Sequence, residues 1–356
     1  MYILGIETSC DETSVSIVKD GYLVLSNVIS SQISKHAVYG GVVPELAARE
    51  HLTALIPVTN QAFKEADISL KDIEALAVTN GPGLIPALLV GLSFAKGICT
   101  EHKLPLLGVN HFIAHIYAAF LNESNKLLAN ADSYPVMALV VSGGHTALVL
   151  IDKDKTAKII GTTIDDAAGE ALDKGAKILN LGYPGGPVID KLSESGNRNA
   201  YHFPRSLTGG AGKPLAEENI FNFSFSGLKT ALLYHIDKIK LENFKEHTLL
   251  DTVASYQYAV IDVLCIKTIR ACRKFKCSSV VLCGGVAQNS LLRTELESRI
   301  PKNVKFILTP KEFCGDNAAM IAGLGFHYLN CKEKDIEIDA FSRLPEITQI
   351  PFVPDI

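Results

Sequence analysis

The chain of 356 residues contains no tryptophan and no large excess of charge of either sign. Its 34 Lys and Arg stand against 38 Asp and Glu, which gives a formal net charge of -4. A protein that binds nucleic acid through a broad basic face carries a strongly positive net charge, so this composition excludes that class. Any nucleic-acid surface must be local or be completed by a partner.

The sequence also lacks CxxC pairs and any apolar stretch of the roughly 18 residues that a membrane span needs. Its eight cysteines lie mostly in apolar runs such as residues 280–283 (VVLC), which is typical of reduced, buried thiols. The chain opens with a strand-like segment, MYILGIE, and no basic region precedes it. We therefore expect a soluble, cytoplasmic protein that is long enough for two domains.

Two histidines, His111 and His115, stand four residues apart in a segment with a helical pattern (HFIAHIYAAF). On a helix they project from one face about one turn apart, which suits two ligands of one transition metal. Zinc-protease helices share this spacing but carry a Glu directly after the first His, where this chain has Phe112. The pair therefore predicts a metal site whose function is not peptide hydrolysis. The alternative is one exposed histidine and one core histidine.

Two parts of the chain repeat one pattern of strands and turns. Residues 2–19 read as strand, small polar turn and strand, and residues 136–151 repeat this pattern. Later in each half a strand runs into glycines and a helix, at residues 73–99 and again from residue 279. Such turns offer backbone N–H groups to an anion, and glycine lets a phosphate approach closely. The pattern resembles the duplicated, two-lobe α/β plan of actin-like (sugar-kinase-like and Hsp70-like) ATPases, which bind nucleotide in an inter-lobe cleft.

Nine features spread along the chain match one family together. They are residues 5–13 (GIETSCDET), 41–45 (GVVPE), 81–84 (GPGL), the His111/His115 pair, 141–146 (VSGGHT), 165–170 (DDAAGE), 183–187 (YPGGP), 222–229 (NFSFSGLK) and 284–286 (GGV). In this set the chain closely resembles the TsaD family of tRNA threonylcarbamoyladenosine transferases. The resemblance runs from about residue 3 to residue 327.

The resemblance implies that His111, His115 and Asp316 hold one divalent metal per subunit, with Fe(II) preferred over Zn(II). From its position alone, Asp316 could instead cap the helix that is expected over residues 317–327. Asp11 and Glu12 are expected in the small polar turn after the first strand, where they would lie near a phosphate or an ion, and no catalytic base is assigned. The resemblance also implies an adenylate site formed by Val140, Val141, Ser142, Gly143, Gly144, Asp173, Gly186, Asp190 and Asn289. In this site Asp173 and Asp190 would accept hydrogen bonds from the ribose hydroxyls.

The implied activity is acyl transfer, from threonylcarbamoyl-AMP to N6 of adenosine 37 in tRNAs that read codons beginning with A. The implied partners are tRNA, a TsaB-like paralogue and a TsaE-like ATPase. An actin-like small-molecule kinase remains an alternative that gives the histidine pair no role. A non-catalytic partner subunit is another, and it would not need the metal trio. Candidate phosphate contacts are Lys174, Lys177, Arg205, Lys213 and Lys229.

The expected domains are an N-terminal lobe over residues 1–110 and a C-terminal lobe over residues 111–330. The second lobe would carry most of the nucleotide and metal site. A helix near residues 317–330 would pack back onto the first lobe, and residues 331–356 would form an extended tail.

Overall fold

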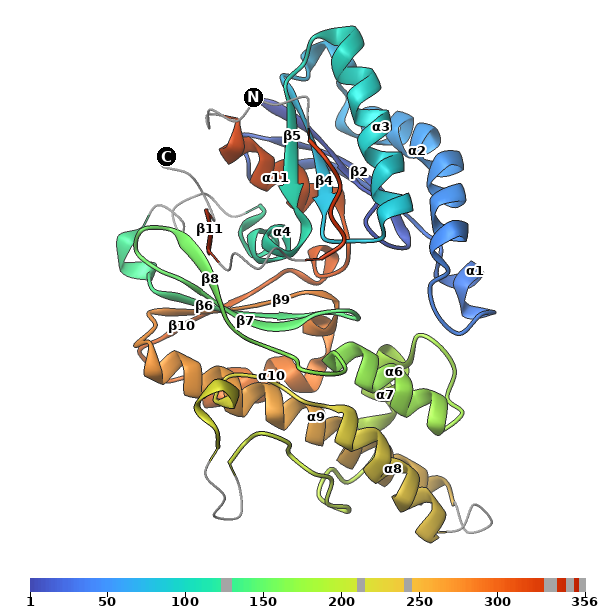
Figure 1. Ribbon diagram of the computed structural model, residues 1–356, viewed down its shortest axis with the longest axis vertical. Helices are drawn as coiled ribbons and strands as arrows, with labels where there is room; N and C mark the ends of the chain where they lie inside the picture. Colours follow the sequence, from blue (N-terminus) through green and yellow to red (C-terminus); the bar gives the residue numbers. More distant parts are fainter. Residues whose placement is uncertain (123–129, 210–214, 240–244, 330–337, 344–348, 352–356) are drawn as a thin grey trace. The chain divides into compact units, whose positions relative to one another are not determined.

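The computed structural model describes six stretches of the chain, residues 1–122, 130–209, 215–239, 245–329, 338–343 and 349–351 (Figure 1). The chain forms two compact units. The first combines Met1–Ser133 with Lys153–Ala157 and Thr309–Ile356, and the second combines Tyr134–Asp152 with Lys158–Leu308. The predicted lobe boundary at residue 110 stays a prediction. In the structure, the described residues that directly follow it group with the first unit.

The first unit is built on a five-stranded mixed sheet in the order β3-β2-β1-β4-β5. Its strands are β1 (Tyr2–Glu7), β2 (Glu12–Lys19), β3 (Leu23–Ser31), β4 (Ala75–Gly81) and β5 (Leu106–Asn110). The first three strands are antiparallel neighbours, whereas β1, β4 and β5 run parallel. The residues of β1, β2 and β4 are largely buried, as expected of strands that are covered on both faces, whereas β3 at the edge is mostly exposed or half-buried.

Helices α2 (Pro44–Ala66) and α3 (Ile85–His102) cover one face of this sheet (Figure 1). Leucine, isoleucine and valine side chains of β1, β2 and β4 form the core with them. Helix α11 (Ala318–Tyr328) packs against β1 and β2 as well. The packing is so close that a Cβ on Gly5 would lie 2.3 Å from the Ala318 carbonyl oxygen, and only glycine fits at this position. The remaining helical segments are α1 (Ile33–Ala37), η1 (Leu70–Asp72), α4 (His111–Tyr117), η2 (Ala118–Phe120), η3 (Ala131–Ser133) and η7 (Lys311–Phe313).

The second sheet has the order β10-β9-β6-β7-β8-β11. Its strands are β6 (Val136–Val141), β7 (Thr146–Ile151), β8 (Thr156–Thr162), β9 (Ser279–Cys283), β10 (Lys305–Leu308) and β11 (Gln349–Pro351). Strands β6 and β7 pair antiparallel, while β6, β9 and β10 run parallel. The order from β8 to β10 therefore repeats the order from β3 to β5. This confirms the duplication that was predicted from the strand–turn–strand and strand–glycine–helix patterns.

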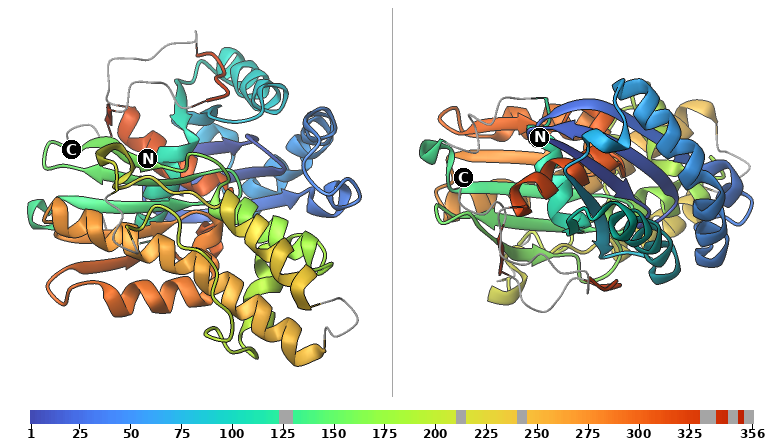
Figure 2. Two further views of the ribbon diagram at one scale, coloured as in Figure 1. Left: turned by 60° about the horizontal axis from the view of Figure 1, so that its bottom comes forward. Right: turned by 90° about the horizontal axis from the view of Figure 1, so that it is seen from above.

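The long helix of the second unit is α9 (Glu246–Lys274), whose apolar residues recur at helical spacing. It runs beside α10 (Ser290–Arg299) and packs on β6 (Figure 2). By length and hydropathy its segment His247–Lys274 could cross a membrane, but 67% of the apolar window is buried within the protein. A core helix has this property. The other helical segments are α6 (Ala168–Ile178), α7 (Gly185–Ser193), η4 (Glu217–Asn219), α8 (Ser226–Ile239) and η6 (Gly285–Gln288).

Candidate metal centre and nucleotide site

Helix α4 presents His111 and His115 on one face, as their spacing predicts. The helix starts where the Asn110 side chain accepts a hydrogen bond from the Ile113 N–H at 3.1 Å, which is the usual N-cap arrangement. The centroids of the two imidazole rings lie 4.6 Å apart, and the rings are nearly perpendicular. Both side chains are buried, so the alternative of one exposed histidine is wrong.

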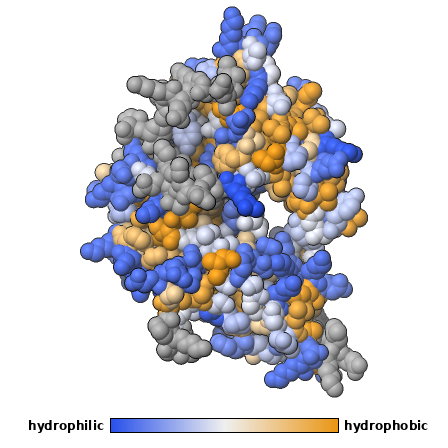
Figure 3. Space-filling view, in the orientation of Figure 1, coloured by the Kyte–Doolittle hydropathy of each residue, from blue (hydrophilic) through white to orange (hydrophobic). Residues whose placement is uncertain are grey.

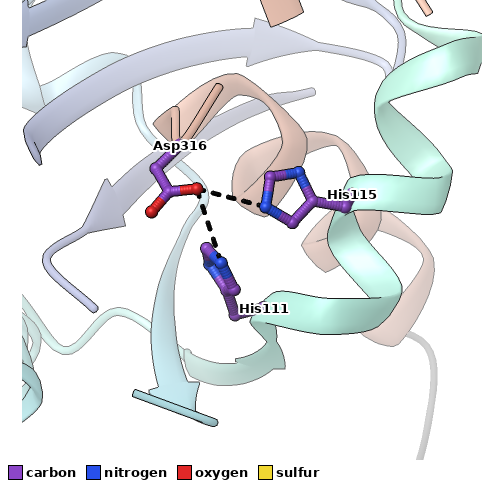
Figure 4. A group of neighbouring side chains, drawn as sticks. All are labelled: His111, His115 and Asp316. Atoms are coloured by element: carbon purple, nitrogen blue, oxygen red, sulfur yellow. Dashed lines mark hydrogen bonds and ion pairs between the residues drawn. The ribbon is translucent and has the colours of Figure 1, made fainter. Parts of the chain in front are cut away.

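Asp316 completes a trio with these histidines at the start of α11. The N-cap of α11 is Asn317, whose side chain accepts a hydrogen bond from the Met320 N–H at 3.1 Å, so the interpretation of Asp316 as the cap is wrong. One Asp316 carboxylate oxygen lies 3.1 Å from Nε2 of His115 and 3.6 Å from Nε2 of His111 (Figure 4). The ligand atoms of the trio all lie within 4.8 Å of one another. Three donors so placed could hold one metal ion.

A buried glutamate, Glu7, orients the first histidine. Its Oε2 lies 3.0 Å from Nδ1 of His111 and also accepts a hydrogen bond from the Thr79 hydroxyl. The Ser9 N–H donates to its Oε1. Because the carboxylate only accepts, Nδ1 carries the proton and Nε2 faces Asp316. A carboxylate behind a histidine is the usual support of a metal ligand. Glu7 was not predicted from the sequence, although an acid that ends a buried strand is a signal of such a role.

The charges around the trio favour a cation. Burial acts to lower the pKa of His111, but the Glu7 and Asp316 carboxylates outweigh it and raise this pKa to about 9. Burial, followed by the carboxylates of Asp316 and Asp11, raises the pKa of Glu12 to about 9. A dication beside these groups would replace the proton on an imidazole and favour ionised carboxylates. In the described part of the chain Nδ1 of His115 is buried without a hydrogen-bond partner. The donor set therefore fits a metal.

Asp11 and Glu12 lie in the same unit as the trio. Asp11 is the last residue of the turn between β1 and β2, whereas Glu12 already begins β2 and is not part of the turn as predicted. Its carboxylate accepts a hydrogen bond from the Ser31 hydroxyl at 3.0 Å. Their predicted contact with a phosphate or an ion stays a prediction.

In the second unit, the predicted residues Val140 and Val141 end β6, and Ser142, Gly143 and Gly144 lie in the turn that leads to β7. The Ser142 N–H donates to the His145 carbonyl oxygen at 2.8 Å, and the His145 N–H donates back to the Ser142 hydroxyl. Gly143 and Gly144 are exposed, and a Cβ on either would meet no atom within 4 Å. The backbone is thus open at this turn, as a phosphate contact requires.

Two further glycines bring neighbouring elements against this turn. A Cβ on Gly169, in α6, would lie 2.6 Å from the Ser142 carbonyl oxygen. Gly284 has a φ of 92°, and a Cβ there would lie 2.3 Å from the Val141 carbonyl oxygen. Both positions need glycine, and Gly284 needs it for its backbone conformation as well. The end of β6 is therefore surrounded by the starts of α6 and η6.

The predicted ribose-binding carboxylates already hold backbone and side-chain donors. One Asp173 oxygen accepts hydrogen bonds from the Gly185 N–H at 2.8 Å and the Gly186 N–H at 3.2 Å, at the start of α7. Asp190 accepts from Gln257 Nε2 at 2.8 Å and from both the N–H and the hydroxyl of Ser290 at 3.0 Å. Burial raises the pKa of Asp173. These bonds fix the helices, and contact with a ribose stays a prediction.

Asn289 and Asp190 share a hydrogen-bond donor, Gln257 of α9, which was not predicted from the sequence. The Asn289 side chain caps α10 by accepting from the Leu292 N–H at 2.9 Å, and it also accepts from Gln257 Nε2 at 3.3 Å. The structure thus brings Asp190 and Asn289 together, and it separately joins Asp173 to Gly186. A Gln in an amphipathic helix gives no signal of this role.

The candidate phosphate contacts have different environments. Lys174 pairs with Asp166 at 2.6 Å and Glu170 at 3.0 Å, and Arg205 pairs with Asp262 at 3.1 Å. Lys177 and Lys229 are exposed, and Lys213 lies outside the described residues. Pairing with carboxylates lowers the availability of the first two for a phosphate.

Comparison with known proteins gives one consistent result along the chain. The family model described as TsaD, tRNA N6-adenosine threonylcarbamoyltransferase, matches residues 23–323. A protein of that name from Syntrophus aciditrophicus is 48% identical, over 97% of this chain and 98% of its own length. Proteins of the same name from Thermosipho africanus and Geobacter sulfurreducens are each 49% identical, over 92% and 97% of this chain and 94% and 97% of their own lengths.

Two solved structures share the fold at low sequence identity. HypF from T. kodakarensis superposes with a TM-score of 0.60 at 14% identity, over 92% of this chain and 48% of that one. Component A of (R)-2-hydroxyglutaryl-CoA dehydratase from Acidaminococcus fermentans gives 0.50 at 17% identity, over 92% and 98%. At such identity the likeness concerns the fold alone. With the repeated sheets, it confirms the predicted actin-like α/β fold class.

Proposed function

The chain belongs to the TsaD family of tRNA N6-adenosine threonylcarbamoyltransferases, and on this premise we propose that it transfers a threonylcarbamoyl group to N6 of adenosine 37 in tRNA. The donor is threonylcarbamoyl-AMP, and the substrates are tRNAs that read codons beginning with A. The observation that carries the proposal is the complete trio of His111, His115 and Asp316 in a chain with this similarity. A small-molecule kinase or a non-catalytic subunit has no use for that trio.

The chemistry explains why such an enzyme needs positioning more than a strong base. The exocyclic amine of adenine is a weak nucleophile because its lone pair is delocalised into the ring. In the transfer, the bond between N6 and the carbamoyl carbon forms, the carbon–oxygen bond to phosphate breaks, and AMP leaves with the electron pair. N6 loses one proton, and we assign no side chain as its acceptor. The protein's task is to align donor and amine and to stabilise charge on the donor oxygens.

A metal held by His111, His115 and Asp316 would supply Lewis-acid stabilisation of the donor's oxygens. Two imidazoles and a carboxylate suit both Fe(II) and Zn(II), and we propose Fe(II) as the native ion. Glu7 keeps Nε2 of His111 directed at the shared position. Support comes from the geometry of the trio and from the excess of carboxylates around it.

The second unit would bind the adenylate. The open turn at Gly143 and Gly144 would face its phosphate, and Asp173, Asp190 and Asn289 would lie at its nucleoside. The modified base lies in a single-stranded loop of tRNA, which an enzyme reaches without melting a duplex. Because the net charge is -4, we expect no large basic surface on this chain, and we expect partner proteins to assist tRNA binding.

We propose a TsaB-like paralogue and a TsaE-like ATPase as these partners, in the cytoplasm. Hydrophobic residues gather over α2 and α3 on the face shown in Figure 3. Leu52 and Ile56 of α2 and Leu89 of α3 are 65%, 61% and 48% exposed, respectively. Such a group of exposed side chains is typical of a protein–protein interface. This surface supports a partner on the first unit.

The direct test combines the purified protein, both partner proteins, threonylcarbamoyl-AMP and unmodified tRNA. Nucleoside analysis of the digested tRNA is expected to show threonylcarbamoyl adenosine, and omission of the paralogue is expected to lower its yield. His111→Ala is expected to abolish the product. His102→Ala, at an exposed histidine of α3, serves as the matched control and should leave the yield unchanged. A full yield from the His111→Ala variant would reject the metal mechanism, and phosphorylation of a metabolite instead would identify a kinase.

A further inference from the structure

The motif at residues 41–45 begins a segment that ends in a buried histidine, His51 of α2. Neither the metal trio nor the adenylate residues include it. His51 is fully buried, and so is His36, which precedes the motif. Buried histidines need hydrogen-bond partners for both ring nitrogens, and these partners show what the motif does.

The partners of His51 fix its tautomer. Nε2 lies 3.0 Å from the Cys10 carbonyl oxygen, which can only accept, so Nε2 carries the proton. Nδ1 lies 2.7 Å from the hydroxyl of Thr13 and accepts from it. Burial lowers the pKa of His51, in keeping with a neutral ring. His51 thereby joins α2 to the turn between β1 and β2, at Cys10, and to the start of β2, at Thr13.

The network continues through Gln32 to His36. The Gln32 N–H donates to the Asp11 carbonyl oxygen at 3.0 Å, and its Nε2 lies 3.4 Å from Nδ1 of His51. Nε2 of His36 donates to Gln32 Oε1 at 3.1 Å, and Nδ1 of His36 accepts from the Val43 N–H. One assignment of protons places a donor opposite an acceptor in each of these contacts. Because Nδ1 of His51 has a single lone pair, the 2.7 Å contact from Thr13 is its hydrogen bond and the 3.4 Å contact from Gln32 is weak. The start of the motif is thus connected to the turn by directional hydrogen bonds between buried groups.

The turn is held from its other side as well. The Leu84 N–H donates to the Ser9 carbonyl oxygen at 2.8 Å, and a Cβ on Gly83 would lie 2.7 Å from that same oxygen. The carbonyl groups of Ser9, Cys10 and Asp11 are therefore all fixed. The turn reaches the metal centre, because the Ser9 hydroxyl lies 3.3 Å from Nδ1 of His111. The Glu12 carboxylate, which follows Asp11, interacts with the carboxylates of Asp316 and Asp11.

We infer that His51 is a positioning residue whose Nε2–H, donated to the Cys10 carbonyl, fixes the turn that carries Asp11 and leads into Glu12 of β2, beside the metal centre. For its effect on threonylcarbamoyl transfer, this inference rests on the proposed function. Its effect on the turn itself does not. His51 touches no candidate metal ligand and acts only through the backbone of the turn.

Two isosteric substitutions separate the roles of the ring nitrogens. In His51→Gln the amide nitrogen reaches as far as Nε2 and can still donate to Cys10. In His51→Asn the amide reaches only as far as Nδ1, so the Thr13 contact can persist while the Cys10 contact is lost. Both variants are neutral and polar. The two variants therefore differ in whether the hydrogen bond to the Cys10 carbonyl remains, and neither variant adds a charge or an apolar group.

In the full-length protein with its partners, His51→Asn is expected to lower kcat about tenfold or more with KM for tRNA within about twofold, because misplaced groups cost rate more than binding. His51→Gln is expected to recover most of the rate. Amide hydrogen exchange over residues 8–14 should be faster in His51→Asn than in the wild type and His51→Gln. Zinc titration should give the wild-type stoichiometry in all three, since no ligand is changed.

Equal exchange over residues 8–14 in all three proteins would overturn the inference. So would an equal loss of kcat in both variants, which would indicate a merely structural histidine. If the wild type itself shows no transfer, the proposed function fails. The exchange comparison still decides whether His51 holds the turn.

Discussion

At the scale of single residues, the metal centre depends on a carboxylate that is not a candidate ligand. Glu7 is completely buried, and its two oxygens hold Ser9, Thr79 and His111 together. Burial acts to raise the pKa of Glu7, but His111 outweighs it, and the pKa lies below its ordinary value. The negative charge of Glu7 thus raises the basicity of the His111 ring that would bind a metal.

Replacing this charge should weaken metal binding while leaving the trio intact. Glu7→Gln keeps an oxygen that can accept from Nδ1 of His111 but removes the charge. We expect the affinity for Zn(II) to fall about tenfold to a hundredfold. Competition with a chromogenic chelator measures this, and Glu65→Gln at an exposed position of α2 is the control. Affinity equal to the control would show that Glu7 does not support the site.

The adenylate turn can be tested at a single glycine. A Cβ on Gly143 would meet no protein atom, so Gly143→Val should change the unfolding free energy by no more than about 0.5 kcal/mol. The added methyl groups would occupy space that a phosphate needs. We expect calorimetric titration with AMP to show weaker binding in Gly143→Val than in Gly143→Ala, and weaker in both than in the wild type. Unchanged binding in the Val variant would place the phosphate elsewhere.

Single residues also show where sequence information ends. The spacing of His111 and His115 predicts a shared face because helix geometry alone determines it. Asp316 and Asn317 are both good capping residues, and only the backbone conformation decides that Asn317 takes the cap. Glu7 and Gln257 were missed because their partners come from distant strands and helices.

At the scale of elements, the position of Asp316 depends on how closely α11 packs on the first sheet. The sheet offers Gly5, the Ser14 hydroxyl and Ala77 to this helix, and Gly325 of α11 lies against Ala77. The Ser14 hydroxyl accepts a hydrogen bond from the Ala318 N–H at 2.9 Å. Small residues thus set the distance between β1 and the helix that follows Asp316.

A single methyl group at this interface should therefore disturb both stability and the metal site. Gly5→Ala places a Cβ against the Ala318 carbonyl oxygen, and we expect a loss of about 1–3 kcal/mol in unfolding free energy. Gly97→Ala, at an open position of α3, should instead stabilise by up to about 1 kcal/mol. Urea unfolding measures both. Equal stability of the two variants would show that α11 does not pack tightly here.

The helices that carry the trio are also joined by Tyr117 and His327. The Tyr117 hydroxyl donates to the Gly21 carbonyl oxygen at 2.8 Å, and its oxygen lies 2.8 Å from Nε2 of His327. Because the hydroxyl proton is used, His327 donates from Nε2. Burial lowers the pKa of His327 to about 4, so the ring that links α4 and α11 is buried in its neutral form, and charging it is unfavourable in the folded state.

This link should make stability depend on pH. The unfolded state binds a proton near the ordinary pKa of 6.5 and the folded state only near 4, so the contribution is complete above 6.5 and lost as the pH falls toward 4. At pH 5 the loss from this one group is about 2 kcal/mol. His327→Gln keeps a donor but does not titrate, and its unfolding free energy should fall less between pH 7 and pH 5. Parallel pH profiles of the two proteins would refute this.

At the scale of the whole molecule, one strand order occurs twice, β3-β2-β1-β4-β5 and β8-β7-β6-β9-β10. Its strands and helices could be predicted because alternating and helical apolar patterns are local. That α11 belongs to the first unit could be expected only from the family resemblance. Local patterns do not show it, because Asp316, which precedes α11, lies 201 residues after His115. The predicted tail over residues 331–356 lies largely outside the described residues.

The most direct test is anomalous X-ray scattering from crystals of the protein purified with its own metal. We predict one peak per chain at the iron or zinc edge, about 2.0–2.2 Å from Nε2 of His111, Nε2 of His115 and a carboxylate oxygen of Asp316. A stoichiometric metal bound elsewhere in the chain would contradict the account. A fully active protein that contains no metal would contradict it as well.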